Sequence, residues 1–434
     1  MKGKMLASVL ALCLFLGISA ADFTLHIYGN ADMDDVIDEI DIEYARGIMD
    51  GTQDMTDLAD VNGDGKVDDE DIRLTEEIIN GTATEIKVID SDGNAVAVKV
   101  PVERIVIYNH QCAEILQILN AADKVTGVRD TFERQGSRFP EICKKKNIGN
   151  GADVDIEAIV SLDPDLIIAY TFYPTKEDLD EKLPSKIPVL RIDCAGGGPC
   201  GIDSIRDCVS ILGYLLEARG EAKKYQEWHD RYVDAVETRT SGIPEEERVR
   251  VYLESTPEGS ETISSRTAIG KNHPAGNLIE LAGGVNVAVG HLPLYMETDE
   301  EYGEIETEWV LEQNPGVIVG RAMGSGVRPY ENEDDSLLRG YADDSLLRGY
   351  ADEIRSLPGF DGVDAVKNDR IYIITNDHAV TPNYPSALLL LAKWFYPEVF
   401  EDLNPKEAHR EYLEMMGISK DLADKNTFYY PEVA

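Results

Sequence analysis

Basic residues are scarce in this chain. Its 434 residues include 41 Lys and Arg against 82 Asp and Glu, which gives a formal net charge of −41 at pH 7. A negative surplus of that size repels nucleic-acid phosphates and anionic lipid headgroups. The sequence therefore excludes a role that depends on nonspecific nucleic-acid binding. At about 150 residues per domain, the length predicts two or three folded units.

Motifs of common enzyme classes are missing as well. The sequence contains no GxSxG, no HExxH and no phosphate-binding loop. Neighbouring acids are too abundant to single out a pair of glycosidase carboxylates. We therefore predict that the chain is not an enzyme.

One long apolar run is present, at the N-terminus. Lys2 and Lys4 precede an uncharged run from Met5 to Ala21, an order typical of an export signal. An uncleaved membrane anchor is the alternative, because the run is close to the lower limit of about 17 residues for a bilayer-spanning helix. Either way, residues 1–21 predict that the rest is exported, to the outer face of the cytoplasmic membrane, the cell surface or the periplasm.

Cysteine is rare, with six residues in all. Apart from Cys13 in the apolar run, these are Cys112, Cys143, Cys194, Cys200 and Cys208. An odd number leaves at least one thiol unpaired. Cys194 and Cys200 flank a Gly-rich loop that can close a small disulfide, and buried free thiols are the alternative.

The most specific local pattern runs from Asp60 to Asp71. Side chains with oxygen occupy loop positions 1, 3, 5, 9 and 12, and Gly65 at position 6 permits the sharp turn of a calcium loop. Position 7 offers a backbone carbonyl, so its side chain does not interfere. The predicted calcium ligands are Asp60, Asn62, Asp64, Lys66 through its carbonyl, Asp68 and Asp71.

A weaker copy lies upstream, with candidate ligands Asn30, Asp32, Asp34, Asp38 and Asp41. Here Asp35 occupies the glycine position, so the second loop is the stronger prediction. Each loop runs into an apolar-periodic helix, over 42–51 and 72–81. Residues 30–85 carry nineteen acids against three bases. A merely solvated acidic face is the alternative to metal binding.

These two loop-helix repeats resemble a dockerin module over residues 29–82. The resemblance implies structural calcium and a cohesin-like protein partner. We assign residues 22–85 to this module.

The remaining sequence alternates strand-like apolar runs with helical periodicity, which predicts parallel sheets covered by helices. The predicted strands are 104–108, 166–170, 189–192, 249–253, 317–320 and 371–375. The segment from Ile156 to Ile168 aligns without gaps with the segment from Thr307 to Val319. We therefore predict an α/β protein with two similar lobes and mainly parallel sheets, at 86–202 and 243–434. The six-residue apolar stretch 387–392 predicts a buried helix.

Residues 203–242 join the two halves. Apolar residues recur there at helical spacing without a proline. We predict a long linker helix, although Gly213 and Gly220 weaken the case for one unbroken helix.

Several motifs resemble the helix-linked solute-binding proteins of ABC importers. They are the strand at 104–108 with the helix after it, the repeated segments, the run from Asn277 to Asn286, the segment 365–372 and Tyr396 to Phe400. Together they extend over about residues 86–418. The resemblance implies a permease and an ATPase as partners and a ligand such as an iron(III) chelate, a corrinoid or an oxyanion.

Ligands of open α/β sheets bind beyond the carboxyl ends of the strands. Arginine, aromatic and polar residues there suit a ligand with anionic oxygens and some apolar surface. The candidate ligand residues are Asn109, His110, Gln111, Tyr170, Phe172, Tyr173, Arg266, Arg321, Asn376, Asp377 and His378. A surface or capping role is the alternative for each histidine.

Glu157 and Glu308 occupy equivalent places in the internal repeat. The resemblance implies that these two carboxylates contact the permease, whereas as isolated residues they would be ordinary helix-start acids.

The predicted function is an exported receptor that delivers an iron(III) chelate to an ABC importer. A corrinoid, molybdate or tungstate receptor is the nearest alternative, and a dockerin-tethered surface enzyme is the alternative of another class. The nine residues 334–342 recur unchanged at 343–351, and we interpret one copy as an insertion in a surface loop.

Overall fold

The computed structural model describes residues 23–194, 203–255, 265–294, 300–322, 345–425 and 428–432. The predicted signal or anchor at 1–21, Cys200 and the first copy of the nine-residue repeat lie outside the described residues. Among the helices that are described, none combines the length and hydrophobicity needed to cross a bilayer.

The N-terminal module contains two short helices, α1 (Glu39–Met49) and α2 (Asp69–Ile79). Each begins three residues earlier than predicted, because Asp38 and Asp68 cap the two helices through their side chains. A small apolar core holds the helices together and includes Ile42 and Ile72. The two loop-helix units therefore lie where the repeat in the sequence predicts them.

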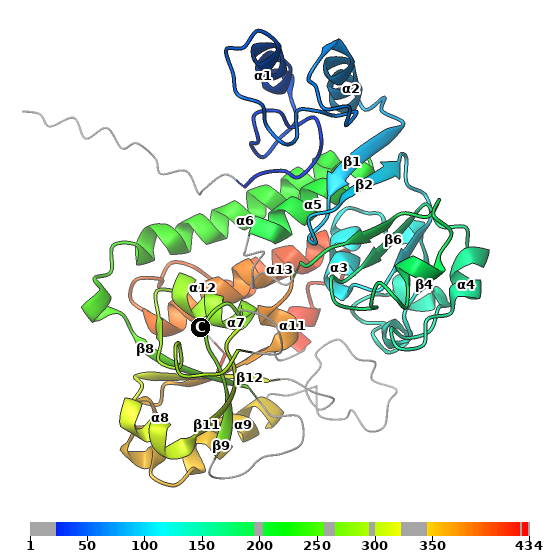
Figure 1. Ribbon diagram of the computed structural model, residues 1–434. Coiled ribbons are helices and arrows are strands. Elements are labelled where there is room, and N and C mark those ends of the chain that lie inside the picture. The colour runs from blue at the N-terminus through cyan, green and yellow to red at the C-terminus, as the bar shows by residue number, and fades with distance from the viewer. Residues whose placement is uncertain are drawn as a thin grey trace, which may run out of the picture.

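An antiparallel hairpin follows the module, formed by β1 (Glu85–Ile89) and β2 (Ala95–Lys99). Ile27 makes a bridge to Val88 in β1, so the chain before the module also joins this hairpin. Figure 1 shows the module above one end of the molecule, with the hairpin beneath it. Phe23 and Leu25 belong to the same apolar core as the large domain. The module is therefore packed on the large domain through a continuous core.

The first lobe, here called the N-lobe, is built on a parallel sheet with strand order β5-β4-β3-β6-β7. The strands are β3 (Ile105–Ile107), β4 (Val125–Val128), β5 (Lys146–Asn147), β6 (Leu166–Ala169) and β7 (Val189–Arg191). Its helices are α3 (His110–Ile118) and α4 (Ile156–Ser161). The predicted strands at 104–108, 166–170 and 189–192 are confirmed.

The second lobe, the C-lobe, contains a mixed sheet. Its order is β11-β9-β8-β12-β13-β14, and β10 also pairs with β8. The strands are β8 (Arg250–Ser255), β9 (Ser265–Ile269), β10 (Val285–Asn286), β11 (Tyr302–Glu306), β12 (Val317–Ala322), β13 (Ile371–Thr375) and β14 (Tyr429–Tyr430). The central strands β8, β12 and β13 are parallel, whereas β9, β11 and β14 are antiparallel. The sheet is therefore mainly parallel only at its centre.

Helices cover the C-lobe sheet on both faces. They are α7 (Pro274–Leu281), α8 (Thr307–Gln313), α9 (Ser345–Ser356), α10 (Asp364–Lys367), α11 (Asn376–Ala379), α12 (Tyr384–Phe395), α13 (Pro405–Met415) and α14 (Leu422–Lys425). Helix α12 is buried along almost its whole length, which confirms the buried helix predicted at 387–392. The second copy of the nine-residue repeat forms the start of α9, where Leu347 and Tyr350 are buried.

The internal repeat is confirmed in the backbone. In each lobe a short helix, α4 or α8, leads through a tight turn into a strand, β6 or β12. The equivalent turn residues Asp163 and Asn314 both adopt φ of 44°. The two copies lie in separate sheets, as the two-lobe prediction requires.

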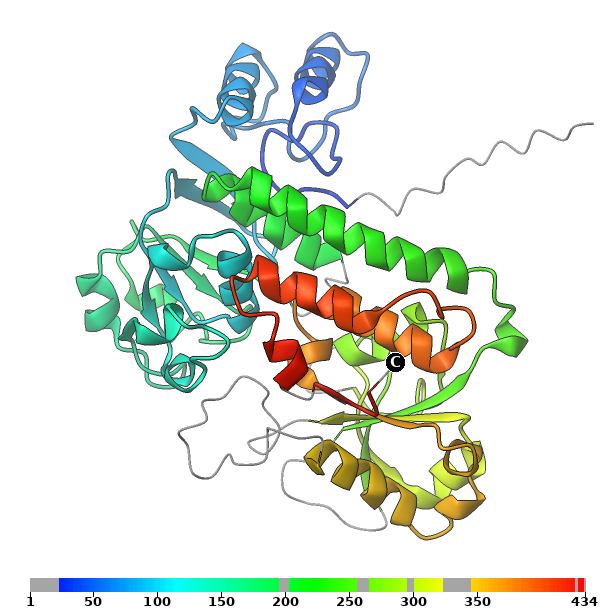
Figure 2. The ribbon, with the colours of Figure 1, turned by 180° about the vertical axis from the view of Figure 1, so that it is seen from behind.

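The linker is a helical hairpin rather than one helix. Helix α5 (Asp203–Leu215) ends before Glu217, whose φ is 57°, and α6 (Arg219–Thr240) begins directly afterwards. At Gly213 a Cβ atom would lie 2.8 Å from Cβ of Ala222, so glycine permits α5 and α6 to pack closely. The prediction of a continuous helix over 203–242 is wrong in this respect. Of the two linker helices, α6 is the one that runs from the N-lobe to the C-lobe, alongside α12 and α13 (Figures 1 and 2).

Candidate ligand site between the lobes

A hydrogen-bonded group centred on Tyr170 forms the N-lobe side of the candidate site. Tyr170 follows β6, and its hydroxyl accepts from the backbone N–H of His110 at 3.0 Å and donates to Oε1 of Gln111 at 3.0 Å. The His110 ring stacks on Phe132 with centroids 4.3 Å apart, and its Nε2 lies 3.2 Å from Oγ1 of Thr131. Burial raises the pKa of Tyr170 to about 12, so the hydroxyl keeps its proton at neutral pH.

Aromatic rings lie beside this group. Phe172 is 72% exposed and stacks on Tyr170 with centroids 5.3 Å apart. The Tyr173 hydroxyl accepts from the backbone N–H of Gly151, where a Cβ atom would lie 1.9 Å from Cζ of Tyr173. Glycine is therefore required at residue 151 for this ring to take its place. We call Tyr170 and Phe172 the aromatic ledge.

Two arginines on the N-lobe side were not predicted from the sequence. Arg129 directly follows β4, and its guanidinium lies 4.9 Å from the centroid of the Tyr173 ring. Arg138 donates to Oε1 of Glu114 at 2.8 Å and lies 3.4 Å from Oδ1 of Asp377. The short apolar run of β4, which is not among the predicted strands, is the sequence feature that could have pointed to Arg129.

Arg321 provides the buried cation of the C-lobe side. It lies near the end of β12, opposite Ser255 of β8 in the sheet register. Its Nη1 is 2.8 Å from Nε2 of His273, the residue that caps α7. Burial lowers the pKa of Arg321 to about 10, so it is charged at neutral pH. Burial also lowers the pKa of His273 well below its usual value, so this imidazole is neutral.

Several buried polar atoms at the carboxyl ends of the strands have no hydrogen-bond partner in the part of the chain that the structure describes. They are the Tyr108 hydroxyl, Arg129 Nε, Asp130 Oδ1, Ser255 Oγ and Thr375 Oγ1. Tyr108 directly follows β3, and Ser255 and Thr375 end β8 and β13. Because buried polar atoms are almost always hydrogen-bonded, this group indicates a place for a polar ligand or water.

The lobes touch at the base of this region. The Tyr412 hydroxyl of α13 donates to Oε2 of the buried Glu114 in α3 at 2.7 Å. Nε2 of Gln111 donates to the carbonyl of Val380 at 3.4 Å, and Asp377 of α11 faces Arg138. Asp377 therefore lies at the junction of the lobes, as predicted for a ligand residue, but a cation of the opposite lobe already lies beside it.

Two predicted ligand residues are buried in structural roles. Asn109 caps α3 by accepting from the backbone N–H of Cys112, and its amide donates to the carbonyl of Ile192. His378 is fully buried, and its Nδ1 lies 2.9 Å from Nδ2 of Asn383. The structure thus keeps both side chains away from the surface between the lobes. Asn376 begins the helix α11 that contains His378.

Arg266 differs most from its predicted role. It was predicted to lie beyond the end of a strand, but it lies within β9, and its side chain is only 3% exposed. It donates twice to the fully buried Glu254, at 2.6 and 3.2 Å, and once to Glu353 at 2.5 Å. Tyr350 also donates to Glu254. With its donors directed to two carboxylates, Arg266 stabilises the C-lobe and is not directed toward a ligand.

Glu157 and Glu308 occupy the second positions of α4 and α8. Both side chains are exposed. Figure 1 shows α4 on the N-lobe and α8 on the C-lobe. This arrangement is compatible with the predicted permease contacts.

The family model described as periplasmic binding protein matches residues 105–378, well over half of the chain. The chain belongs to the periplasmic binding protein family. The matched residues span both lobes and the linker, and they begin after the N-terminal module and the hairpin.

Relatives within this family differ in their ligands. The molybdate-binding protein MolA of Haemophilus influenzae is 23% identical over 339 residues, which cover 72% of this chain and 85% of MolA. A cobalamin-binding protein of Halobacterium salinarum is 26% identical over 237 residues, which cover 53% of this chain and 57% of the relative. The crystal structure of a TroA-like periplasmic binding protein, FepB, from Veillonella parvula superposes with a TM-score of 0.60 at 21% identity, covering 76% and 95% of the two chains.

Membership of the family confirms three predictions. The fold is the two-lobe α/β fold, the protein is an ABC transporter substrate-binding protein, and it is not an enzyme. A substrate-binding protein of this kind works with a permease and an ATPase.

The second loop of that module turns tightly at two glycines. Gly63 and Gly65 have φ of 78° and 88°, and the Asp60 carboxylate accepts from the backbone N–H groups of both. The buried Asp71 carboxylate accepts from the N–H groups of Asn62 and Asp68.

The first loop repeats this pattern only in part. The Asp41 carboxylate accepts from the N–H groups of Asp32 and Asp38, as Asp71 does in the second loop. Asp35, unlike Gly65, is not among the residues with positive φ. Asn30 takes the place of Asp60 and donates its amide to the carbonyls of Leu25 and Asp34. The two loops therefore differ in backbone conformation at the position where the second has Gly65.

The residues that are described contain no group of three or more His, Cys, Asp or Glu side chains close enough to hold a metal ion. Two of the predicted calcium ligands, the Asn62 amide and the Lys66 carbonyl, are not His, Cys, Asp or Glu side chains and therefore could not belong to such a group. Calcium binding therefore remains a prediction.

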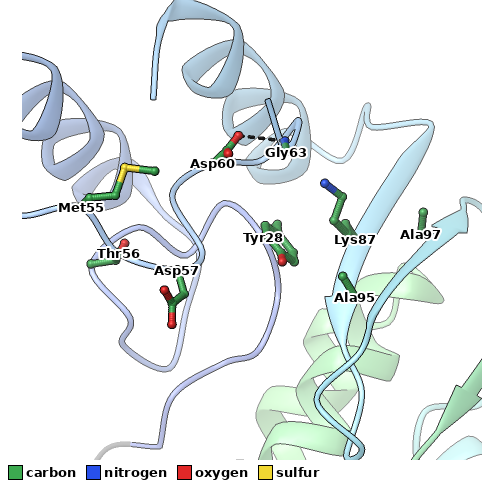
Figure 3. A pocket seen from close by; sticks show the side chains of 9 residues that line it. All are labelled: Tyr28, Met55, Thr56, Asp57, Asp60, Gly63, Lys87, Ala95 and Ala97. Atoms are coloured by element: carbon green, nitrogen blue, oxygen red, sulfur yellow. Dashed lines mark hydrogen bonds between the residues drawn. The ribbon is translucent and has the colours of Figure 1, made fainter. Parts of the chain in front are cut away.

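A cavity of about 330 Å³ separates the second loop from the hairpin. Figure 3 shows Lys87 of β1 reaching toward the loop beside Tyr28. The Lys87 ammonium donates to the carbonyl of Val61 at 2.9 Å and lies 4.7 Å from the centroid of the Tyr28 ring. Lys87 thus links the loop to the hairpin.

Proposed function

We propose that this periplasmic binding protein captures an iron(III) chelate between its lobes and delivers it to an ABC permease. The observation that carries the proposal is the group of unpartnered polar atoms at the strand ends of both lobes, together with the buried, charged Arg321 near the end of β12. A ligand with anionic oxygens would accept from the hydroxyls of Tyr108, Ser255 and Thr375 and would pair with the guanidinium groups. Asp130 Oδ1, which only accepts, would be satisfied by a donor of the ligand or by water.

The aromatic ledge favours a chelate over a compact oxyanion. Phe172 is largely exposed although it is apolar, and covering it would require a ligand that extends beyond a tetrahedral anion. Aromatic side chains give large contact area at little cost in conformational entropy. A metal chelate with an organic framework offers such a surface.

Molybdate is the second candidate, because MolA aligns with this chain over most of its own length. Calorimetric titration of the purified protein with a ferric tricatecholate, a ferric trihydroxamate, cyanocobalamin and molybdate distinguishes the ligand classes. We expect saturable binding of a ferric chelate. Binding of molybdate or cobalamin alone would contradict the proposed ligand, and binding of none of the four would contradict this view of the site.

The variant Phe172→Ala tests the ledge directly. It should weaken binding of the chelate about tenfold, or about 1.4 kcal/mol, and leave any molybdate binding unchanged. Phe172 is exposed, so its truncation should not affect folding. Equal affinities of the variant and the parent for the chelate would contradict the assigned role.

For delivery, we propose that Glu157 and Glu308 contact the permease. Replacing both by Lys should leave ligand affinity unchanged and abolish uptake in reconstituted vesicles. Replacing the exposed Glu312 of α8 by Lys provides a matched control on the same helix. Loss of ligand binding in the double variant would refute the assignment.

For the N-terminal module, we propose that the second loop binds calcium and that the module docks to a cohesin-like partner. Calcium titration should find one site, abolished by Asp64→Ala and retained in Asp34→Ala at the equivalent position of the first loop. Two sites, or equal effects of the two variants, would contradict the asymmetry. A cohesin domain should bind the full chain in calcium but not in a chelator.

A further inference from the structure

Three buried cysteine side chains meet where α3, the end of β7 and α5 come together. Cys112 lies in the first turn of α3, Cys194 follows β7, and Cys208 belongs to α5. Cys112 and Cys194 are fully buried and Cys208 nearly so. The Sγ atoms of Cys112 and Cys194 are 3.5 Å apart. This pairing joins two parts of the sequence that no local pattern connects.

We propose that Cys112 and Cys194 form a disulfide in the exported protein and that this bond braces the N-lobe side of the ligand site. A disulfide requires the sulfur atoms to approach to about 2.05 Å, so rotation of the two side chains would have to close the gap from 3.5 Å. Proteins outside the cytoplasm fold under conditions in which disulfides form and persist.

The backbone around the two cysteines is already held together. The Asn109 side chain accepts from the N–H of Cys112 at 3.0 Å and donates to the carbonyl of Ile192 at 2.8 Å. These bonds connect the first turn of α3 to the end of β7. A disulfide would therefore reinforce an existing connection without moving either element far.

The brace lies next to residues of the candidate site. His110 and Gln111 precede Cys112 in the same helical turn. A covalent link from this turn to β7 would restrict how far these two side chains move when the lobes open. The disulfide thus concerns the geometry of the site as well as stability.

We expect the disulfide to form during folding, before the two thiols are buried, and to be shielded from reductants afterwards. Burial raises the pKa of the Cys194 thiol well above its ordinary value and raises that of Cys208 to about 12. The reactive species in thiol–disulfide exchange is the thiolate, so the folded, reduced protein would react slowly. In the cell the two electrons and two protons would pass to the disulfide of an exported dithiol oxidase; in vitro, oxidised glutathione accepts them and yields two reduced glutathione molecules.

The test is refolding of the full chain in a glutathione redox buffer, followed by alkylation in denaturant without reductant and tryptic mapping. Cys112, Cys194 and Cys208 fall in separate tryptic peptides, 105–124, 192–206 and 207–219. We expect peptide 105–124 joined to peptide 192–206, with Cys208 alkylated. The cross-link should persist in Cys200→Ala and Cys208→Ala and disappear in Cys112→Ala.

The other outcomes contradict the proposal. A disulfide within peptide 192–206 would mean that Cys194 pairs with Cys200. A disulfide between peptides 192–206 and 207–219 would mean that Cys194 or Cys200 pairs with Cys208. Alkylation of every cysteine would mean that no disulfide forms. The melting temperature of the oxidised protein should also fall on reduction, by on the order of 10 °C for a loop of this length. Cys112→Ala should show no such fall, and a cross-linked protein insensitive to reductant would overturn the bracing role.

Discussion

Replacing Arg266 by Met should destabilise the C-lobe strongly. Arg266 is 3% exposed and Glu254 is 0% exposed, and the two are joined by two hydrogen bonds. Removing one partner of a buried ion pair leaves an uncompensated charge, which costs about 3–5 kcal/mol. In a unit of the size of this lobe, that loss corresponds to a melting temperature lower by about 6–20 °C.

Thermal unfolding followed by calorimetry and near-ultraviolet circular dichroism measures this effect. The matched control is Glu353→Gln, because Glu353 also contacts Arg266 but is 41% exposed. An exposed partner contributes at most about 1 kcal/mol, so the control should melt close to the parent. The double variant Arg266→Met with Glu254→Gln should recover most of the lost stability, since it buries no charge.

The destabilisation should also depend on pH. Burial raises the pKa of Glu254, and without Arg266 only the hydrogen bond from Tyr350 would offset that burial. The variant should therefore lose most stability near neutral pH and least below the ordinary pKa of glutamate, where the carboxyl is protonated in both states. An Arg266→Met protein that melts like the parent but no longer binds the ligand would refute the structural role and restore the ligand role.

Three further predictions concern other parts of the protein. Burial lowers the pKa of His378 to about 3 from an ordinary value of 6.5. The contribution of His378 to stability is therefore complete above pH 6.5 and is lost as the pH falls toward 3, by about 1.4 kcal/mol per pH unit. In a pH series of melting temperatures, His378→Gln should lose less stability at acid pH than a variant of the exposed His291. Gly151→Ala should displace the Tyr173 ring and cost about 1–3 kcal/mol through overpacking, and denaturant unfolding checks this. Deleting residues 334–342 should shift the melting temperature by less than about 2 °C, because the second copy of the repeat supplies the buried residues of α9.

The parts of the fold that could be predicted are those encoded by local patterns. The repeat around Asp163 and Asn314 combined a helix, a turn and a strand in one ungapped segment, and the structure reproduces all three in both lobes. The break between α5 and α6 could not be predicted from periodicity, because both helices bury an apolar face and the spacing continues through Glu217. The nearby glycines were the available signal, and Gly213 proves to be a packing contact.

The candidate site was less predictable because the role of each residue depends on contacts with residues that are distant in the sequence. Arginine is a residue type that often binds anionic ligands, but the role of Arg266 depends on the pairing of β9 with β8, which places Glu254 beside it. His378 is buried against His409, a residue of α13 that sequence proximity does not reveal. Position after a strand selected residues at the strand ends, whereas the direction of each side chain depended on contacts distant in sequence.

The attachment of the N-terminal module has a consequence for how the receptor could work when tethered. Its contacts to the large domain run through α5 and the start of α6, where Asp207 bonds to His26, Tyr214 accepts from the N–H of Ile37, and Arg219 donates to the carbonyl of Ile79. A partner that binds the module would thus hold the receptor by its linker helices, at α5 and the start of α6. None of these contacts involves Tyr170 or Arg321, so attachment to a surface through the module would leave these residues of the candidate site uncovered.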